Sequence, residues 1–117
     1  MAHRPLPEKL IDLIAQRFRV LGEPMRIKLL CALAQAPATV GELREVSGGT
    51  QQNVSKHLGV LAAAGIVDRK KHGNCTVYSI ADETVFSMCD QVCGALHEQA
   101  HELDELLNAS NQEGANK

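Results

Sequence analysis

Residues 50–67 read TQQNVSKHLGVLAAAGIV, and this stretch decides the fold. Thr50 is a favourable helix N-cap, and Val54, Leu58 and Leu61 recur at the spacing of one helix face. The other face is rich in amides and hydroxyls, where an ordinary hydrated helix more often carries Glu and Lys. Its polar residues are Gln51, Gln52, Asn53, Ser55, Lys56 and His57. The stretch therefore predicts an amphipathic helix with an unusual polar face.

Such a face has the donors and acceptors that reading DNA in the major groove requires. Gln and Asn can form paired hydrogen bonds with adenine, Ser and Thr can bond to base edges or phosphates, and Lys can reach guanine or phosphate. Because a polar helix face is often simply hydrated, the flanking sequence has to decide between these two interpretations.

The residues before this helix predict a partner helix. Val40, Leu43 and Val46 follow helical spacing over about residues 39–47, and Ser47-Gly48-Gly49 makes a turn of small residues. Two helices joined by such a turn form a helix-turn-helix.

The residues after it predict a β-hairpin. Ile66-Val67 leads into a polar, basic stretch, Gly73-Asn74 is a turn, and residues 76–80 alternate in the manner of a strand. The basic stretch contains Arg69, Lys70, Lys71 and His72. A hairpin with these side chains near its tip would form a wing over the phosphates beside the groove.

The chain resembles the ArsR/SmtB family of small winged-helix repressors over about residues 10–107. The stretches that carry the resemblance are RVLGEPMRIKLLCAL at 19–33, VGELREVSG at 40–48, QQNVSKHLGVLAAAGIV at 51–67 and HGNCTVYSI at 72–80. The resemblance implies a homodimer, built through its first and last helices, that binds an operator. It also implies release from DNA when a metal ion, a metalloid or a thiol-modifying signal is sensed.

The predicted fold is mainly α (α+β), a winged helix-turn-helix with about five helices and a β-hairpin wing. We expect one domain over 1–117, with an ordered core at about 7–107 and flexible ends. The remaining helices are expected from Pro7 to about Leu21, from Pro24 to about residue 34, and from Asp82 onward. The helix that begins at Thr50 is called the reader helix here, because its polar face would read bases. Two reader helices related by a two-fold axis would fit double-stranded DNA with an inverted repeat. Arg26, early in the second helix, is either a phosphate contact or an ordinary surface arginine.

Charge is divided unevenly along the chain. Residues 1–81 hold 11 Lys or Arg against 6 Asp or Glu, a net of +5, and residues 82–117 hold 1 against 8, a net of −7, which together give −2. A basic body and an acidic tail would orient the protein on DNA, although the acids could equally serve only to keep a helix hydrated. No apolar run approaches a membrane span and no signal sequence opens the chain, so we expect a cytoplasmic protein without a membrane partner.

The four cysteines are more readily interpreted as thiols than as structural disulfides. Cys89 and Cys93 are i, i+4 neighbours on the last helix, and with His97 they could hold a soft or transition metal ion as effector. Simple interface packing explains the two cysteines equally well. Redox sensing would involve Cys31, Cys75 or Cys93, although Cys31 lies among apolar residues and fits a buried position.

The resemblance gives further limits on sensing. In one persulfide-sensing branch of the family, one cysteine matches Cys31 and a partner cysteine lies late in the last helix. The position that matches this partner is His97 here, so the second thiol is missing. The paired cysteines of arsenic and cadmium sensors would match residues 42–45, where this chain has none. The ligand positions of the zinc sensors read Asp82, Thr84, Ala95 and Glu98, which lack both histidines.

No cofactor is required by this interpretation, and no enzyme activity is expected, because no cysteine, base and oxyanion site converge in the sequence. The alternatives are a winged-helix module that binds protein, or a constitutive DNA-binding regulator with no effector.

Overall fold

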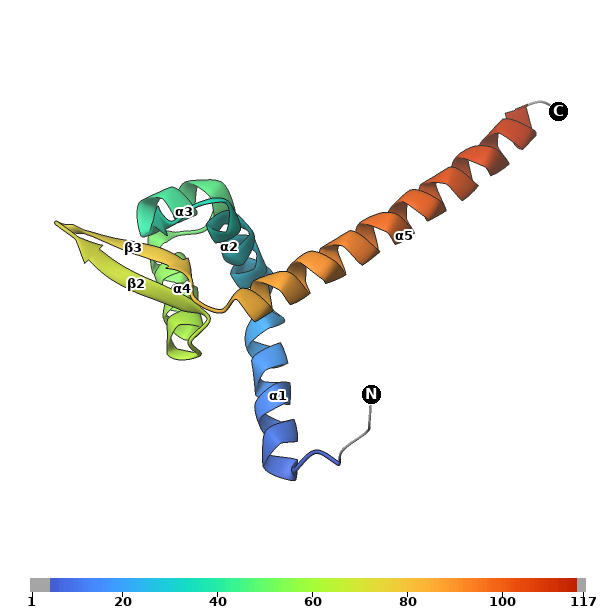
Figure 1. Ribbon diagram of the computed structural model, residues 1–117. Helices are drawn as coiled ribbons and strands as arrows, with labels where there is room; N and C mark the ends of the chain where they lie inside the picture. The colour runs from blue at the N-terminus through green and yellow to red at the C-terminus, as the bar shows by residue number, and fades with distance from the viewer. Residues whose placement is uncertain (1–4, 116–117) are drawn as a thin grey trace. The chain divides into compact units, whose positions relative to one another are not determined.

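The computed structural model describes residues 5–115, with side chains through residue 109. Within this part the chain forms five helices and three strands, in the order α1 (Glu8–Leu21), α2 (Pro24–Gln35), β1 (Ala38–Thr39), α3 (Val40–Ser47), α4 (Gln51–Ala63), β2 (Val67–His72), β3 (Cys75–Ile80) and α5 (Glu83–Ala115) (Figure 1). The chain divides into two compact units, residues 1–83 and 84–117. Of the ends expected to be flexible, residues 1–4 and 116–117 lie outside the described part.

Local side-chain chemistry begins the helices where the sequence predicts. The Glu23 carboxylate accepts a hydrogen bond from the backbone N–H of Met25, and Pro24 occupies the first turn of α2. At the start of α3, Thr39 Oγ1 accepts from the N–H of Glu42 at 3.2 Å, and Glu42 Oε1 accepts from the N–H of Thr39 at 3.0 Å. This reciprocal capping box satisfies two backbone donors that the helix leaves free.

The turn between α3 and α4 combines a glycine and a cap. Gly48 ends α3 with φ 76°, a left-handed conformation that L side chains rarely adopt. Thr50 Oγ1 then accepts a hydrogen bond from the N–H of Asn53 at 3.1 Å and starts α4. The predicted helix-turn-helix is therefore confirmed.

The core of the first unit is aliphatic. Leu29, Leu43, Leu58, Leu61 and Ile66 are fully buried, and Val54, Val67 and Tyr78 complete the packing. These residues bring α2, α3, α4 and the sheet together. Val46, which shares helical spacing with Val40 and Leu43, is 73% exposed. Leu43 is the one buried residue of α3.

The three strands form an antiparallel sheet in the order β1-β3-β2. β2 and β3 pair from Val67 opposite Ile80 to His72 opposite Cys75. Gly73, with φ 64°, begins the two-residue turn, as in a type II′ hairpin. Figure 1 shows the turn at the end of the hairpin far from the helices. The wing is confirmed, while β1, which pairs with β3 at Ala38 and Tyr78, is a strand that the sequence did not predict.

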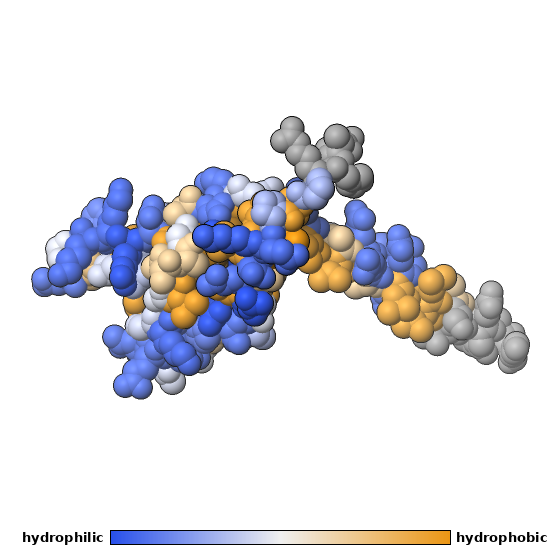
Figure 2. All heavy atoms as spheres, turned by 90° about the horizontal axis from the view of Figure 1, so that it is seen from below, coloured by the Kyte–Doolittle hydropathy of each residue, from blue (hydrophilic) through white to orange (hydrophobic). Residues whose placement is uncertain are grey.

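α1 and α5 each carry apolar side chains in contact with solvent. On α1 these include Leu13 and Phe18, both 55% exposed, and on α5 they include Leu96 at 59% and Leu106 at 69%. Figure 2 shows hydrophobic patches alternating with polar ones along α5. α5 continues to Ala115, past the limit of about residue 107 expected for the ordered core. Among the described residues, no helix is both long and apolar enough to span a membrane.

Candidate DNA-binding surface

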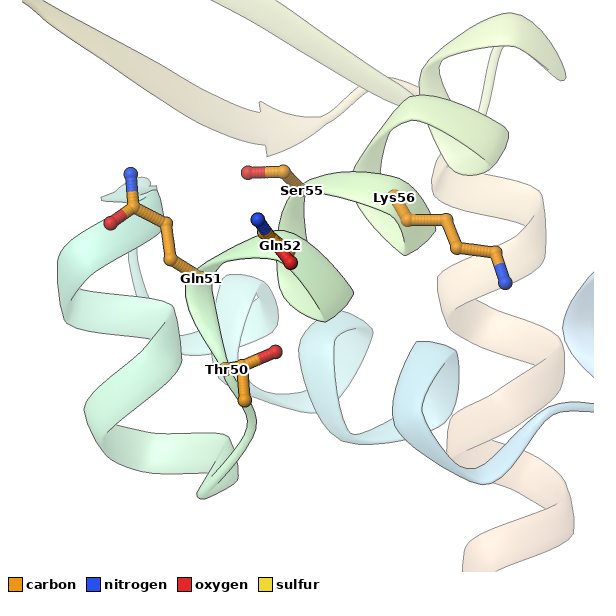
Figure 3. Close-up of a pocket in the computed structure, with 5 residues that line it drawn as sticks. All are labelled: Thr50, Gln51, Gln52, Ser55 and Lys56. Atoms are coloured by element: carbon orange, nitrogen blue, oxygen red, sulfur yellow. The ribbon is translucent and has the colours of Figure 1, made fainter.

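The polar face of α4 is open to solvent. Its exposed side chains are Gln51, Gln52, Asn53, Ser55 and Lys56. Together with Thr50, four of these line a hollow in the surface. Figure 3 shows Gln51 and Ser55 pointing to one side of the helix and Lys56 to the other. The face thus presents amide, hydroxyl and ammonium groups, which can contact base edges and phosphates.

His57 lies elsewhere, and its assignment to this face has to be corrected. The residue is only 7% exposed, and its Nδ1 accepts a hydrogen bond from Arg26 Nε at 3.1 Å. His57 follows Val54 by three residues and precedes Leu61 by four, so helical geometry puts it on the buried face with them. An imidazole can occupy this position because Arg26 satisfies its nitrogen. His57 is therefore a packing residue of α4 and does not read bases.

Arg26 is not the ordinary surface arginine that was one of the two expectations. It is partly buried, and besides His57 it contacts the carbonyl oxygen of Val20, to which its Nη1 donates at 3.0 Å. The guanidinium is therefore engaged within the protein. The sequence holds no signal for this contact, because Arg26 and His57 lie 31 residues apart.

The wing presents the predicted cations. Arg69, Lys70, Lys71 and His72 are all exposed along β2, and α4 packs against this strand. Asp68 is exposed beside them. Because β2 and the start of β3 extend beyond the helices, the cations can approach a phosphate backbone without rearrangement of the core.

The candidate sensing cysteines lie on three elements, α2, β3 and α5. Cys31, Cys75 and Cys93 are exposed thiols, and Cys89 is partly exposed. The expected burial of Cys31 is wrong, because its position on α2 faces away from the neighbouring core leucines Leu29, Leu30 and Leu33.

The described residues of one protomer do not form a compact metal site. In the part of the chain that the structure describes, no three His, Cys, Asp or Glu residues gather as metal ligands. The predicted set of Cys89, Cys93 and His97 is thus not assembled. The physical reason is helical drift, since each i+4 step advances by about 40° beyond a full turn.

Comparison with known proteins shows the family to which the chain belongs. A helix-turn-helix domain family matches residues 21–70. The biofilm growth-associated repressor of Agrobacterium fabrum is 38% identical over 81 residues, which span 68% of this chain and 69% of that protein. The chain belongs to the ArsR/SmtB family of winged helix-turn-helix transcriptional regulators. It spans about two thirds of the length of the curated relatives that it matches.

Solved structures agree with this assignment. The homodimeric winged helix-turn-helix DNA-binding domain Mb0332 from Mycobacterium bovis, a possible ArsR-family regulator, is 25% identical with a TM-score of 0.74, over 87% of this chain and 95% of that one. The antimony-specific transcriptional repressor AntR is 26% identical with a TM-score of 0.78, over 86% of this chain and 92% of that one. The function is therefore DNA-binding transcriptional regulation.

Proposed function

We propose that this ArsR/SmtB-family regulator is a homodimeric repressor that binds an inverted-repeat operator in the cytoplasm. The observation that carries the proposal is the exposed row of amide and hydroxyl groups on α4, next to an exposed cationic wing. In this arrangement residues 50–56 read bases and contact nearby phosphates, while residues 69–72 contact the flanking backbone. Phosphate contacts position the protein, and base contacts specify the sequence.

The homodimer is supported by the apolar surfaces of α1 and α5. Phe18 and Leu96 are more than half exposed, and so are several neighbours on the same two helices. Side chains of this size gain about 1.5 to 3 kcal/mol each when they are fully buried. A second copy of the chain would bury them, and the related Mb0332 domain is itself homodimeric.

An inverted repeat follows from the two-fold symmetry of such a dimer. Its two α4 helices would enter successive major grooves, whose centres lie about 34 to 36 Å apart along the duplex. Each half-site would then be read by one protomer.

Release from DNA is proposed to follow binding of a metal or metalloid ion or modification of a thiol. The ion route uses Cys89, Cys93 and His97, with further ligands from the second protomer, because one protomer gathers no group of three in its described part. The structural relative AntR is an antimony-specific transcriptional repressor, which supports a metalloid as one candidate signal for this chain. The thiol route uses the exposed Cys31, Cys75 or Cys93. Either signal must bind or modify one dimer state in preference to the other to shift the equilibrium.

The test is a fluorescence-anisotropy titration of the reduced protein on DNA from upstream of its own gene. The titration is repeated with zinc, nickel, cadmium, arsenite, antimonite, a persulfide and an oxidant. Release by one ion that is lost in Cys89→Ser/Cys93→Ser, but kept in Cys75→Ser, supports the ion route. Release by sulfur species or oxidant alone supports the thiol route.

Two outcomes would contradict the proposal. Tight binding that no addition changes would leave a constitutive regulator without an effector. No binding to upstream DNA or to random DNA would favour a protein-interaction module.

A further inference from the structure

Two arginines link α4 to α1 through hydrogen bonds, which are called the arginine ties below. α1 is the helix proposed to lie at the dimer interface. The first is Arg26. Its Nε donates to His57 on α4 at 3.1 Å, and its Nη1 donates to the carbonyl oxygen of Val20 on α1 at 3.0 Å. One planar guanidinium therefore bridges the middle of the reader helix and the last turn of α1. Lysine, a point charge on a flexible stem, does not offer this fixed fork of donors.

The second is Arg17, which lies on α1 itself. Its Nη1 donates to the carbonyl oxygen of Ala64, the residue that caps the C-terminal end of α4, at 2.8 Å. A cation at the C-terminal end of α4 also interacts favourably with the negative end of the helix dipole. The same Nη1 lies 3.9 Å from Asp82, a longer contact across a partly exposed surface.

We propose that Arg17 and Arg26 are positioning residues that set the half-site spacing the dimer accepts. Neither side chain has to touch DNA for this role. The inference rests on the proposed function, in which α1 forms part of the dimer interface and α4 reads DNA. The two-fold axis fixes the two α1 helices, and the arginine ties then fix each α4 relative to its α1. The distance and angle between the two reader helices follow from those constraints.

Spacing is a sensitive measure of that geometry. One base pair more or less between half-sites moves one of them by about 3.4 Å along the duplex and about 35° around it. A dimer whose two α4 helices are held rigidly would lose DNA contacts at one half-site when the spacing changes. A dimer whose α4 helices can move would keep those contacts. Base preference within one half-site depends instead on the exposed face of α4, which the arginines do not contact.

The experiment first selects the preferred inverted repeat from random DNA with the wild-type protein. Affinities are then measured for that duplex and for versions with one central base pair inserted or removed, using wild type, Arg17→Met and Arg26→Met. Methionine keeps much of the apolar stem and removes the guanidinium. The control is Arg19→Met, which removes an exposed cation from α1, the helix that carries Arg17.

We expect wild type and Arg19→Met to prefer the selected spacing. In Arg17→Met and Arg26→Met that preference should fall by at least about tenfold, the effect of losing one hydrogen bond to a charged group. Arg17→Met loses one such bond and Arg26→Met loses two. The penalty for a base substitution within one half-site should stay at its wild-type value. An unchanged spacing preference would overturn the inference, as would an equal loss of spacing preference and half-site preference, which indicates a general weakening of the fold. If wild type selects no DNA at all, the proposed function fails first and the inference with it.

A second comparison covers the case in which thermal unfolding shows that Arg26→Met does not fold. His57→Asn places an amide oxygen near the position of Nδ1 and keeps an acceptor for Arg26, while His57→Leu keeps an apolar side chain and removes the acceptor. We expect His57→Asn to retain more of the spacing preference than His57→Leu. Equal preferences in the two variants would overturn the role of the Arg26 tie.

Discussion

Replacing Lys70 on the wing should flatten the salt dependence of DNA binding. Each protomer exposes four permanent cations on the proposed DNA surface: Lys56, Arg69, Lys70 and Lys71. A dimer that places each of them on a phosphate neutralises about eight, which gives a slope of log affinity against log salt of about −7. Lys70→Ala removes two of these contacts per dimer, so the slope should change to about −5.

The predicted change is large enough to measure. The two slopes differ by about 1.8. The fold loss of affinity caused by Lys70→Ala should therefore be about tenfold greater at 50 mM salt than at 200 mM salt. Anisotropy titrations at four or five salt concentrations would give both slopes, on operator and on random DNA. The loss should be alike on the two DNAs, because phosphate contacts carry no sequence information.

Lys9→Ala is the control, because Lys9 is an exposed lysine on α1 outside the proposed surface. A wild-type slope in Lys70→Ala would refute the placement of the wing on phosphates. So would the same flattening in Lys9→Ala, which would mean that overall charge and not the wing determines the slope.

Other changes test the reader helix, its turn and the thiols. Gln52→Ala and Ser55→Ala should each lose preference for operator over random DNA, by about fivefold or more if the side chain reads a base, and equal losses on both DNAs would argue against base reading. Thr50→Ala removes the cap on Asn53 and should lower the free energy of unfolding by about 1 kcal/mol, measured by urea denaturation. Gly48→Ala should also destabilise the fold, by about 1 kcal/mol, because φ is 76° there, while no neighbouring atom would obstruct the added carbon. Cys75→Ser should blunt release by oxidant if the wing thiol is the sensor, and an unchanged response would exclude that thiol.

The helices could be predicted because their boundaries are set by neighbours in the sequence. Thr39 and Glu42 form a capping box three residues apart, and Pro24 and Thr50 start their helices with their own side chains. The wing was predictable for the same reason, since Gly73 supplies the conformation that its turn requires.

Features that depend on contacts between distant parts of the chain could not be predicted from the sequence. β1 is two residues long and exists only because Ala38 meets Tyr78 on β3. Helical spacing already places His57 on the buried face with Val54 and Leu61, but its partner Arg26 lies 31 residues away and could not be predicted. Most of the α4 face, by contrast, follows from the positions of Val54, Leu58 and Leu61 alone, and its exposed residues agree with the prediction.

The strand order also has a consequence for solubility. With β3 in the middle, β2 is an edge strand of six residues, and its outer backbone groups have no neighbouring strand in the described sheet. An edge of that length can pair with the edge of another molecule, and lysine and arginine side chains are a common means of discouraging it. Arg69, Lys70 and Lys71 would therefore keep free protein molecules apart before any DNA is bound. A variant neutralised at all three positions should lose affinity for DNA and also become prone to aggregate through its wings.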